Sequence, residues 1–410
     1  MSKLFRSAPG GLRGLTALSG VLVGSLLLGA CGGGSTSAGG SDGGSGDIVI
    51  GSYGPLSGPA ASISVLYDGM QAYFDEVNAK GGIKGHKVRL KVQDDQLNPA
   101  QTPSAARQLV ERDKALMMCG PSGSPTTMAV KDYLEARNVA IVPGAGSSEL
   151  TGRTSYLQVP TYTPLAAQLA QYAVEDMGMR RVAIAYSEDS VGKPTVAGAR
   201  WQLEQMGVKP VAEVTYNATA PDQSALAAKL KAAKADFVII NNTAPVISQV
   251  FKAADKIGFR PQWGTVWPAL NKNLLELSGG SLDKGNIVFS SPFILGDAPE
   301  AEEYRAVLDK HKPGLDVTDT IVMLGWTSAT VCHQVLERAI EAAGGKTPTR
   351  EQVVAAMPGL TYDDAYVNGL RWTEDNRTGQ REANVIGVKN GKFVALTDFR
   401  ELPDAPESRR

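Results

Sequence analysis

The stretch from Ala115 to Asp132, ALMMCGPSGSPTTMAVKD, holds the residue types with the most evident capacity for chemistry. A short apolar run breaks into glycine, proline and serine at positions 120–125 and then resumes as a helical pattern. Three kinds of site share this outline: a loop that binds phosphate, a turn that exposes a nucleophilic serine, and a loop that holds a small ligand with backbone N–H groups and hydroxyls.

Two of these chemistries lack residues that they require. A phosphate loop has the form G-x-x-x-x-G-K-[ST], and no lysine follows the glycines between positions 120 and 130. A nucleophile turn has the form G-x-S-x-G, and GPSGS at 120–124 lacks the final glycine. We therefore predict that the loop binds a ligand, that the protein is not an enzyme, and that it has no catalytic residue. A serine hydrolase is the alternative that the two serines leave open.

The histidines do not support metal or acid–base chemistry. The chain has three, His86 in a tight turn, His311 at a charged helix end and His333 in an apolar helix. None is expected beside a serine at a strand end. They are too scattered for a zinc site, and on a helix the adjacent Cys332 and His333 would point about 100° apart. We predict no metal and no cofactor.

The length and composition describe an ordinary soluble globular protein. The 410 residues suffice for two domains that each bury a core. The 41 basic and 42 acidic side chains leave no net field that would attract a polyanion. We therefore predict no nucleic acid among the partners.

The amino-terminal residues have the pattern of a secretion signal. Basic residues precede an uncharged stretch from Leu15 to Ala30, which is too short for a comfortable membrane span. We predict a signal peptide over residues 1–30 and an extracytoplasmic location.

The signal ends in Leu-Gly-Ala-Cys at positions 28–31, which resembles the bacterial lipobox. That resemblance implies lipidation of Cys31, and hence attachment to the cell membrane through a lipid anchor. A simple signal peptide followed by a chance cysteine is the alternative. Residues 31–46 continue as a Gly/Ser linker, which cannot bury a core.

Two cysteines remain, Cys119 at the end of an apolar strand and Cys332 in an apolar helix. Buried thiols are common in such surroundings, so we expect two free thiols. An oxidising compartment would also permit a disulfide between them.

From Asp47 onward, β-rich runs alternate with amphipathic helical runs, which predicts an α/β protein with largely parallel sheets. The pattern repeats after a proline-rich stretch at 160–164, so we expect two lobes of similar build. The expected strands include 48–53, 87–93, 115–119, 139–143, 182–187, 210–216, 236–242 and 263–267. The expected helices lie around 105–111, 128–136, 165–177, 195–206, 222–234, 246–257 and 320–343.

The motifs GSYGPLSGP at 51–59 and NAKGGIKGHKVRLKVQDDQLNPAQ at 78–101 carry a resemblance to a known family. With PGAGSSELT at 143–151 and GLRWTEDNRTGQ at 369–380, the chain resembles the type I periplasmic substrate-binding proteins of the branched-chain amino-acid (Leu/Ile/Val) transporter class. The resemblance extends from Ile48 to about Leu396.

The resemblance implies two doubly wound, Rossmann-like lobes joined by three hinge crossings and closing on a ligand. The boundaries that we expect are 47–162 with about 296–362 for lobe 1, 163–295 with about 363–400 for lobe 2, and a polar tail at 401–410. It further implies delivery of a small ligand to the permease subunits of an ABC transporter, and we expect a monomer. A tethered sensor for a membrane receptor is the alternative.

Ligands of doubly wound sheets gather at the carboxyl ends of the strands, where loops and helix starts meet. The predicted ligand-binding residues follow from strand order, and the resemblance implies that Ser124, with Ser122 next, lies near a ligand carboxylate. The full set is Tyr53, Ser122, Ser124, Gly146, Ser147, Ser148, Asp189, Val191, Asn242, Thr243 and Trp267. The other interpretation is helix capping for the serines and packing beneath its own loop for Trp267.

The chain departs from the family's amino-acid binders at positions that bear on the ligand. Those proteins usually have a threonine where Gly146 stands, an aromatic residue at Val191 and often at Thr243, and an acidic residue near Trp267. The support for an α-ammonium ligand is correspondingly weak. The predicted set suits an amino acid, a carboxylate or an amide with an apolar or aromatic body.

Overall fold

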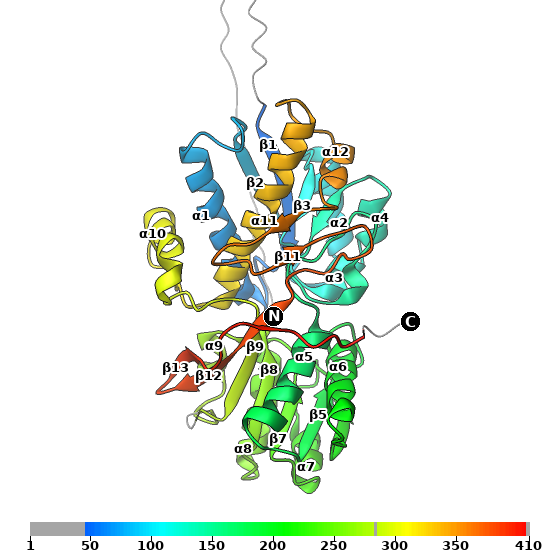
Figure 1. The fold of residues 1–410 in the computed structure, drawn as a ribbon, viewed down its shortest axis with the longest axis vertical. Coiled ribbons are helices and arrows are strands. Elements are labelled where there is room, and N and C mark those ends of the chain that lie inside the picture. Colours follow the sequence, from blue (N-terminus) through cyan, green and yellow to red (C-terminus); the bar gives the residue numbers. More distant parts are fainter. Residues whose placement is uncertain (1–45, 283–284, 407–410) are drawn as a thin grey trace, which may run out of the picture. The chain divides into compact units, whose positions relative to one another are not determined.

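The computed structural model describes residues 46–282 and 285–406 (Figure 1). The predicted signal peptide, the lipidated Cys31 and all of the linker except residue 46 lie outside the described residues, as do residues 407–410 of the predicted tail. Within the described ranges, no helix is both long enough and apolar enough to cross a membrane.

Lobe 1 is built on a parallel sheet with the strand order β2-β1-β3-β4. Its strands are β1 (Ile48–Gly54), β2 (Val88–Asp94), β3 (Met117–Cys119) and β4 (Ala140–Val142). The three strands β1, β3 and β4 are almost wholly buried, as expected for a parallel sheet that is covered on both faces.

The two faces of this sheet pack into different cores because side chains alternate along a strand. Ile48 and Ile50 face the core shared with helices α1 and α11, whereas Val49 and Tyr53 face the opposite core, which includes residues of α2. Alternate side chains of β1 therefore face opposite cores. The helices of lobe 1 are α1 (Val65–Ala79), α2 (Thr102–Arg107), α3 (Ser124–Met128), α4 (Lys131–Glu135), α10 (Glu302–His311), α11 (Thr320–Ala342) and α12 (Arg350–Ala355).

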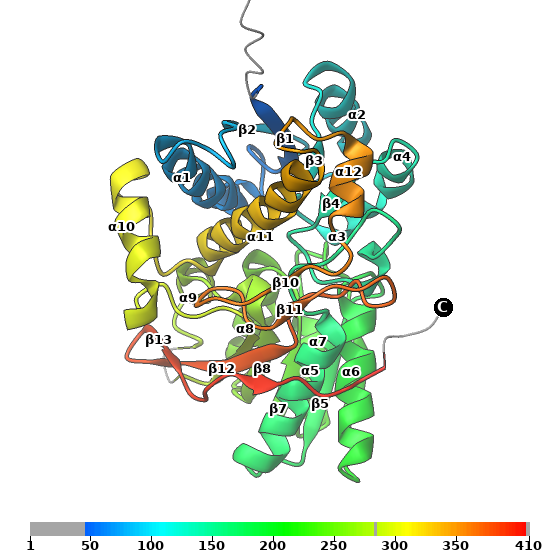
Figure 2. The same ribbon diagram turned by 45° about the horizontal axis from the view of Figure 1, so that its top comes forward.

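The helices α1 and α11 come from distant parts of the chain and lie side by side (Figure 2). A Cβ on Gly69 of α1 would collide with the carbonyl oxygen of Val322, and a Cβ on Gly325 of α11 would collide with that of Leu66. The two glycines thus allow the backbones to approach more closely than any other residue would. This contact holds the amino-terminal half of α11 against α1.

Cys119 and Cys332 form a disulfide, with their Cα atoms 6.2 Å apart. The expectation of two free thiols is therefore wrong. Burial and apolar neighbours are the same for a thiol and for a buried bridge, so the sequence pattern could not distinguish them. The bridge joins the last residue of β3 to the middle of α11 and encloses a loop of 213 residues.

Lobe 2 contains the larger sheet, with the order β13-β12-β9-β8-β7-β5-β6 and with β14 paired to β12. The strands β5 to β9 run parallel, and β12 runs antiparallel to β9. The strands are β5 (Val182–Tyr186), β6 (Ala212–Thr215), β7 (Phe237–Ile240), β8 (Gln262–Val266), β9 (Ile287–Ser291), β12 (Glu382–Lys389), β13 (Lys392–Ala395) and β14 (Arg400–Glu401).

Helices cover both faces of this sheet as well. Val182 and Ile184 of β5 pack on the same side as residues of α5 and α6, whereas Ala183 and Ala185 pack on the side of α7 and α8. The helices of lobe 2 are α5 (Tyr162–Gln171), α6 (Gly192–Gln205), α7 (Ser224–Ala232), α8 (Ala244–Lys256) and α9 (Lys272–Leu277).

The chain passes three times between the two lobes, after β4, after β9 and before β12. The first and third crossings lie side by side: the Leu157 N–H donates to the Arg377 carbonyl (2.9 Å), and the Gln380 N–H to that of Gln158 (3.2 Å). The short hairpin of β10 (Thr361–Tyr362) and β11 (Leu370–Arg371) leads into the third crossing, where the Trp372 indole donates to the Leu157 carbonyl (2.7 Å).

Removal of the disulfide by the double change Cys119→Ser and Cys332→Ser should lower the free energy of unfolding by about 2–5 kcal/mol, because the unfolded chain regains the entropy of a long loop. Urea unfolding measures this loss. Addition of dithiothreitol should destabilise the parent protein and leave the double variant unchanged. Peptide mass spectrometry that finds both cysteines alkylated without prior reduction would contradict the bridge.

Candidate ligand-binding site

A cavity of about 450 Å³ lies where loops of the two lobes meet. Its size falls in the ordinary range of small-molecule sites. Lobe 1 supplies Ile63, Leu66, Leu97, Pro99, residues 122–126, Gly144, Ala145, Ile321 and Leu324 to its wall. The second part of the chain, from Tyr162 to Pro268, supplies Tyr162, Asp189, Val191, Ala218, Thr219, Asn241, Asn242, Thr243, Val246, Trp267 and Pro268.

The wall of lobe 1 that carries the opening motif is held by a short chain of hydrogen bonds. The Tyr67 hydroxyl donates to the Tyr53 carbonyl (2.7 Å) and lies 3.0 Å from Ser122 Oγ. The Ser122 N–H donates to the same Tyr53 carbonyl (3.0 Å). Gly123 then turns the chain with a φ of 84°, where a Cβ would meet Thr126 and Leu97.

Ser124 begins α3 directly after this turn. Its side chain is 2% exposed, and its Oγ has no hydrogen-bond partner in good geometry among the described residues. Ser124 interacts with the Tyr162 phenol, whose pKa is raised by burial, an effect that Gly146 and Ser124 oppose. A buried hydroxyl without a partner costs roughly 1–3 kcal/mol, which a ligand could recover.

In lobe 2, one carboxylate oxygen of Asp189 binds the turn that leads into α6. Its Oδ1 accepts hydrogen bonds from the Ser187 hydroxyl (2.8 Å) and from the N–H groups of Val191 and Gly192 (2.9 Å each). It is the one charged residue among those that line the cavity in the described part of the chain. The cavity therefore offers an anion no cationic side chain.

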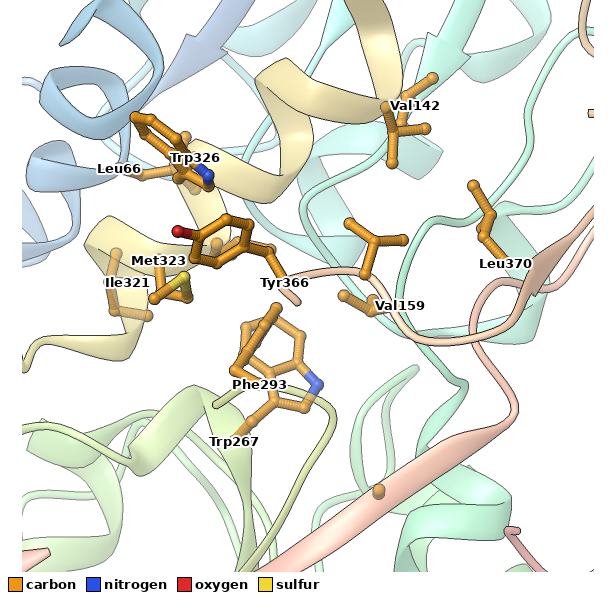
Figure 3. Packing of buried hydrophobic residues seen from close by; sticks show 14 of the residues in the cluster. Leu66, Val142, Val159, Trp267, Phe293, Ile321, Met323, Trp326, Tyr366 and Leu370 are labelled. Carbon is orange, nitrogen blue, oxygen red and sulfur yellow. The ribbon is translucent and has the colours of Figure 1, made fainter. Parts of the chain in front are cut away.

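Trp267 belongs both to the hydrophobic core and to the cavity wall. Figure 3 shows it against Phe293, and the two rings meet edge to face with centroids 5.5 Å apart. Only 2% of the side chain is exposed, and its Nε1 has no hydrogen-bond partner among the described residues. The two interpretations that the sequence left open, packing and a place at the ligand site, are therefore compatible.

The structure brings seven of the eleven predicted residues to this cavity. They are Ser122, Ser124, Asp189, Val191, Asn242, Thr243 and Trp267. The remaining four, Tyr53, Gly146, Ser147 and Ser148, do not line it.

Tyr53 is directed to the other side of the sheet by the alternation along β1. It is fully buried in the core that includes residues of α2, beside the Thr127 hydroxyl, and neither of these two oxygens has a hydrogen-bond partner in good geometry. Tyr53 contributes to the site through its backbone carbonyl, which holds Tyr67 and Ser122.

The loop at 146–148 lies behind the cavity wall. A Cβ on Gly146 would approach the Pro160 carbonyl to 2.7 Å and the Tyr162 ring to 3.1 Å. The ring of Tyr162 thus takes the room that the threonine expected from the family resemblance would need. Ser147 is fully buried, and Ser148 starts a 3-10 turn whose carbonyl accepts from the Thr151 hydroxyl (2.8 Å).

Four polar residues of the wall are absent from the predicted set: Thr126, Tyr162, Thr219 and Asn241. Tyr162 begins α5, and Asn241 directly follows β7. Asn241 could have been found, because it is the first residue after a buried strand, next to Asn242. The apolar residues Ile321 and Leu324 of α11 carry no such signal, since they belong to a uniformly apolar helix.

The three histidines lie away from the cavity. His86 is hydrogen-bonded to the carbonyls of Gly46 and Gly345, His311 to Glu76, and His333 to the Tyr73 hydroxyl. Across the residues that the structure describes, no cluster of three or more histidine, cysteine or acidic side chains is arranged to hold a metal ion.

The comparisons with known proteins identify the family of this two-lobed chain. The sequence model of the periplasmic binding proteins matches residues 47–392. The chain belongs to this family. Among relatives, this periplasmic binding protein is 33% identical over 372 residues to the Leu/Ile/Val-binding protein BraC3 of Rhizobium johnstonii, with 85% of this chain and 94% of the relative covered. It is 25% identical over 312 residues to an amino acid binding protein of Pseudomonas aeruginosa, with 74% and 81% covered.

Solved structures share the fold. A branched chain amino acid ABC transporter protein from Thermus thermophilus, with bound valine, superposes with a TM-score of 0.77 at 19% identity, over 87% of this chain and 97% of the other. A fatty acid ABC transporter substrate-binding protein from Thermomonospora curvata gives 0.77 at 21% identity, over 88% and 95%. The predicted type I fold, two doubly wound α/β lobes joined by three crossings, is confirmed.

The change Tyr67→Phe should destabilise this periplasmic binding protein by about 1–2 kcal/mol, because the Ser122 hydroxyl and the Tyr53 carbonyl each lose a buried partner. Urea unfolding measures the loss. Tyr53→Phe is the matched control, since the Tyr53 hydroxyl has no hydrogen-bond partner in good geometry among the described residues, and its removal should cost under about 0.5 kcal/mol. Equal losses in the two variants would contradict the hydrogen-bond assignment.

A smaller cavity of about 30 Å³ adjoins the large one, with Ile63, Thr243, Pro268 and Ile321 common to both walls. Asp319 lines it and caps α11 by accepting the Ile321 N–H (2.8 Å).

Burial raises the pKa of Asp319 from 3.8 to about 6. Because the folded protein takes up this proton at a higher pH than the unfolded chain, the contribution of Asp319 to the free energy of unfolding should rise as the pH falls from about 7 to about 4, while carboxylates with lowered pKa values, such as Glu76, contribute in the opposite direction. Two pKa units correspond to about 3 kcal/mol. Asp319→Asn keeps an oxygen for the cap and removes this contribution, so the parent protein should gain stability relative to the variant as the pH falls. Urea unfolding at several pH values measures it, and parallel pH profiles for the two proteins would contradict the shift.

Proposed function

We propose that this protein is an extracytoplasmic solute-binding lipoprotein that captures a small ligand in the cavity of about 450 Å³ and delivers it to the permease subunits of an ABC transporter. The observation that carries the proposal is the composition of the wall. Residues of both lobes line one cavity, so a bound ligand gains contacts that favour the arrangement in which the lobes meet.

The chemistry of the wall supports a ligand with an apolar body and a compact polar group. Leu66, Leu97, Val246, Ile321 and Leu324 are suited to an aliphatic or aromatic body, and Trp267 adds a large flat surface. The ligand class that we propose is an amino acid or a related carboxylate or amide. The names of the relatives are in keeping with it, since they describe binders of leucine, isoleucine and valine, of amino acids in general, and of fatty acids.

The lipid anchor at Cys31 and the monomeric state are parts of the same proposal. The disulfide between Cys119 and Cys332 supports an oxidising, extracytoplasmic compartment, because such bridges persist there and are rare in the cytosol. A tethered sensor would use the same cavity, and stimulation of the ATPase of a reconstituted permease would distinguish transport from sensing.

The serine hydrolase alternative has little support from the cavity. None of the histidines at positions 86, 311 and 333 lines it, so Ser124 has no histidine base at hand. Ester or amide turnover that disappears in Ser124→Ala would favour a hydrolase over a binding protein.

A thermal-shift screen of amino acids, small carboxylates and amides tests the function. At least one class should raise the unfolding temperature without formation of product. The change Val246→Trp places a large ring at a half-buried position of the wall and should abolish the response. Gln249→Trp is the control, because residue 249 is exposed on the same helix α8 and does not line the cavity.

An unchanged ligand response in Val246→Trp would show that the cavity is not the site. The absence of a response to every compound in the parent protein would contradict the proposed ligand class.

A further inference from the structure

Asn241 is a residue of the cavity wall whose two amide atoms have different surroundings. It follows β7 directly and is 1% exposed. Its Nδ2 donates to Thr195 Oγ1 (3.0 Å), whereas its Oδ1 is buried and has no hydrogen-bond partner among the described residues. Since the backbone carbonyl of Asn241 accepts from the Tyr216 hydroxyl (3.3 Å), the residue is fixed from both sides.

The orientation of the Asn241 amide is determined by Thr195. The Thr195 hydroxyl has one proton, and it donates that proton to the Val191 carbonyl (2.8 Å). Its oxygen can therefore only accept from Asn241, and a reversed amide would place two acceptors against each other. Asn241 must turn Nδ2 towards Thr195, and the atom left without a partner is the acceptor Oδ1.

Three further polar groups of the wall bear on what the ligand must carry. Asp189 is a second acceptor, half-buried and negatively charged. Trp267 Nε1 is a donor, and Ser124 Oγ in lobe 1 can act as either. Because no lysine, arginine or histidine is among the lining residues of the described chain, a ligand meets the two acceptors and the Trp267 donor of lobe 2 with no cationic side chain beside them.

We propose that Asn241 is a specificity-determining residue, whose Oδ1 selects a ligand that carries an N–H donor on an apolar body. This inference rests on the proposed function and narrows its ligand class to compounds with an ammonium or a carboxamide group. The N–H donor pairs with Asn241 Oδ1, and the oxygen of the same ligand accepts from the Ser124 hydroxyl or the Trp267 indole.

A carboxylate that lacks nitrogen fits this wall poorly for two reasons. It is an acceptor only, so it leaves Asn241 Oδ1 without a hydrogen bond from the ligand. It also brings a negative charge to a wall whose one charged residue is Asp189. A site that is built to pair a donor discriminates strongly against an analogue without one.

Isothermal titration of the full chain with three compounds of one carbon skeleton tests the inference. Leucine carries the ammonium, 4-methylpentanamide the carboxamide, and 4-methylpentanoate neither. Leucine, the amide or both should bind, and 4-methylpentanoate should bind at least 10-fold more weakly than the better of the two. Whether leucine or 4-methylpentanamide binds more tightly shows whether an ammonium or a carboxamide supplies the N–H donor.

Binding of 4-methylpentanoate within threefold of the better compound overturns the inference and leaves the proposed function standing. Binding of none of the three overturns the inference, and the proposed function falls with it only when the wider thermal-shift screen is also silent. The titration uses the unaltered protein, so it does not depend on the folding of a variant.

The change Asn241→Leu assigns the effect to this residue. The affinity for the nitrogen-bearing ligand, divided by the affinity for 4-methylpentanoate, should fall by at least 5-fold in this variant. Asn384→Leu is the matched control, because Asn384 is another buried asparagine of the same sheet with an unpartnered Oδ1 and does not line the cavity. An unchanged ratio in Asn241→Leu, or an equal change in the control, overturns the role of Asn241.

Discussion

The close contact between α1 and α11 is the constraint on which the first wall of the cavity depends. Gly69 and Gly325 each face a backbone carbonyl of the other helix, and any side chain at either position would force the helices apart. Because α11 also carries Ile321 and Leu324 at its amino-terminal end, this contact sets where two apolar residues of the wall lie. The disulfide from Cys332 to Cys119 then ties the same helix to the strand that precedes the glycine–serine loop.

The second wall depends on the ends of parallel strands. Asp189, Asn241 and Trp267 follow β5, β7 and β8, which are neighbours in one sheet, so their loops meet at one edge. Each loop is fixed by its own capping or packing contacts. The polar atoms that remain free after these contacts define what the site can recognise, and they are few.

Much of the architecture could be predicted from the sequence, because its signals are local. The run from Thr320 is apolar and helical in pattern, and α11 indeed spans Thr320–Ala342. The expected helices near 165, 195 and 246 each begin two or three residues earlier, at Tyr162, Gly192 and Ala244. Each of these helices has a proline in its first turn, where proline is compatible with a helix. The proline that resembled a helix break in the sequence is therefore part of the helix.

The binding site was harder to predict from the sequence, because it depends on the directions in which side chains point and on contacts between residues far apart in the chain. Strand order brought loops of both lobes to the cavity, but the alternation along β1 directs Tyr53 to the opposite core. Tyr162 lines the wall from a helix start that the pattern placed later. The disulfide depends on a Cα separation of 6.2 Å between residues 213 positions apart, which no local pattern contains.

The central claim is that one ligand is held between the two lobes in this cavity. A crystal structure of the protein with the best compound from the thermal-shift screen tests it most directly. The account predicts density for the ligand within contact distance of both Ser124 in lobe 1 and Asn241 or Trp267 in lobe 2. Density at another place, or contacts with a single lobe, would contradict it.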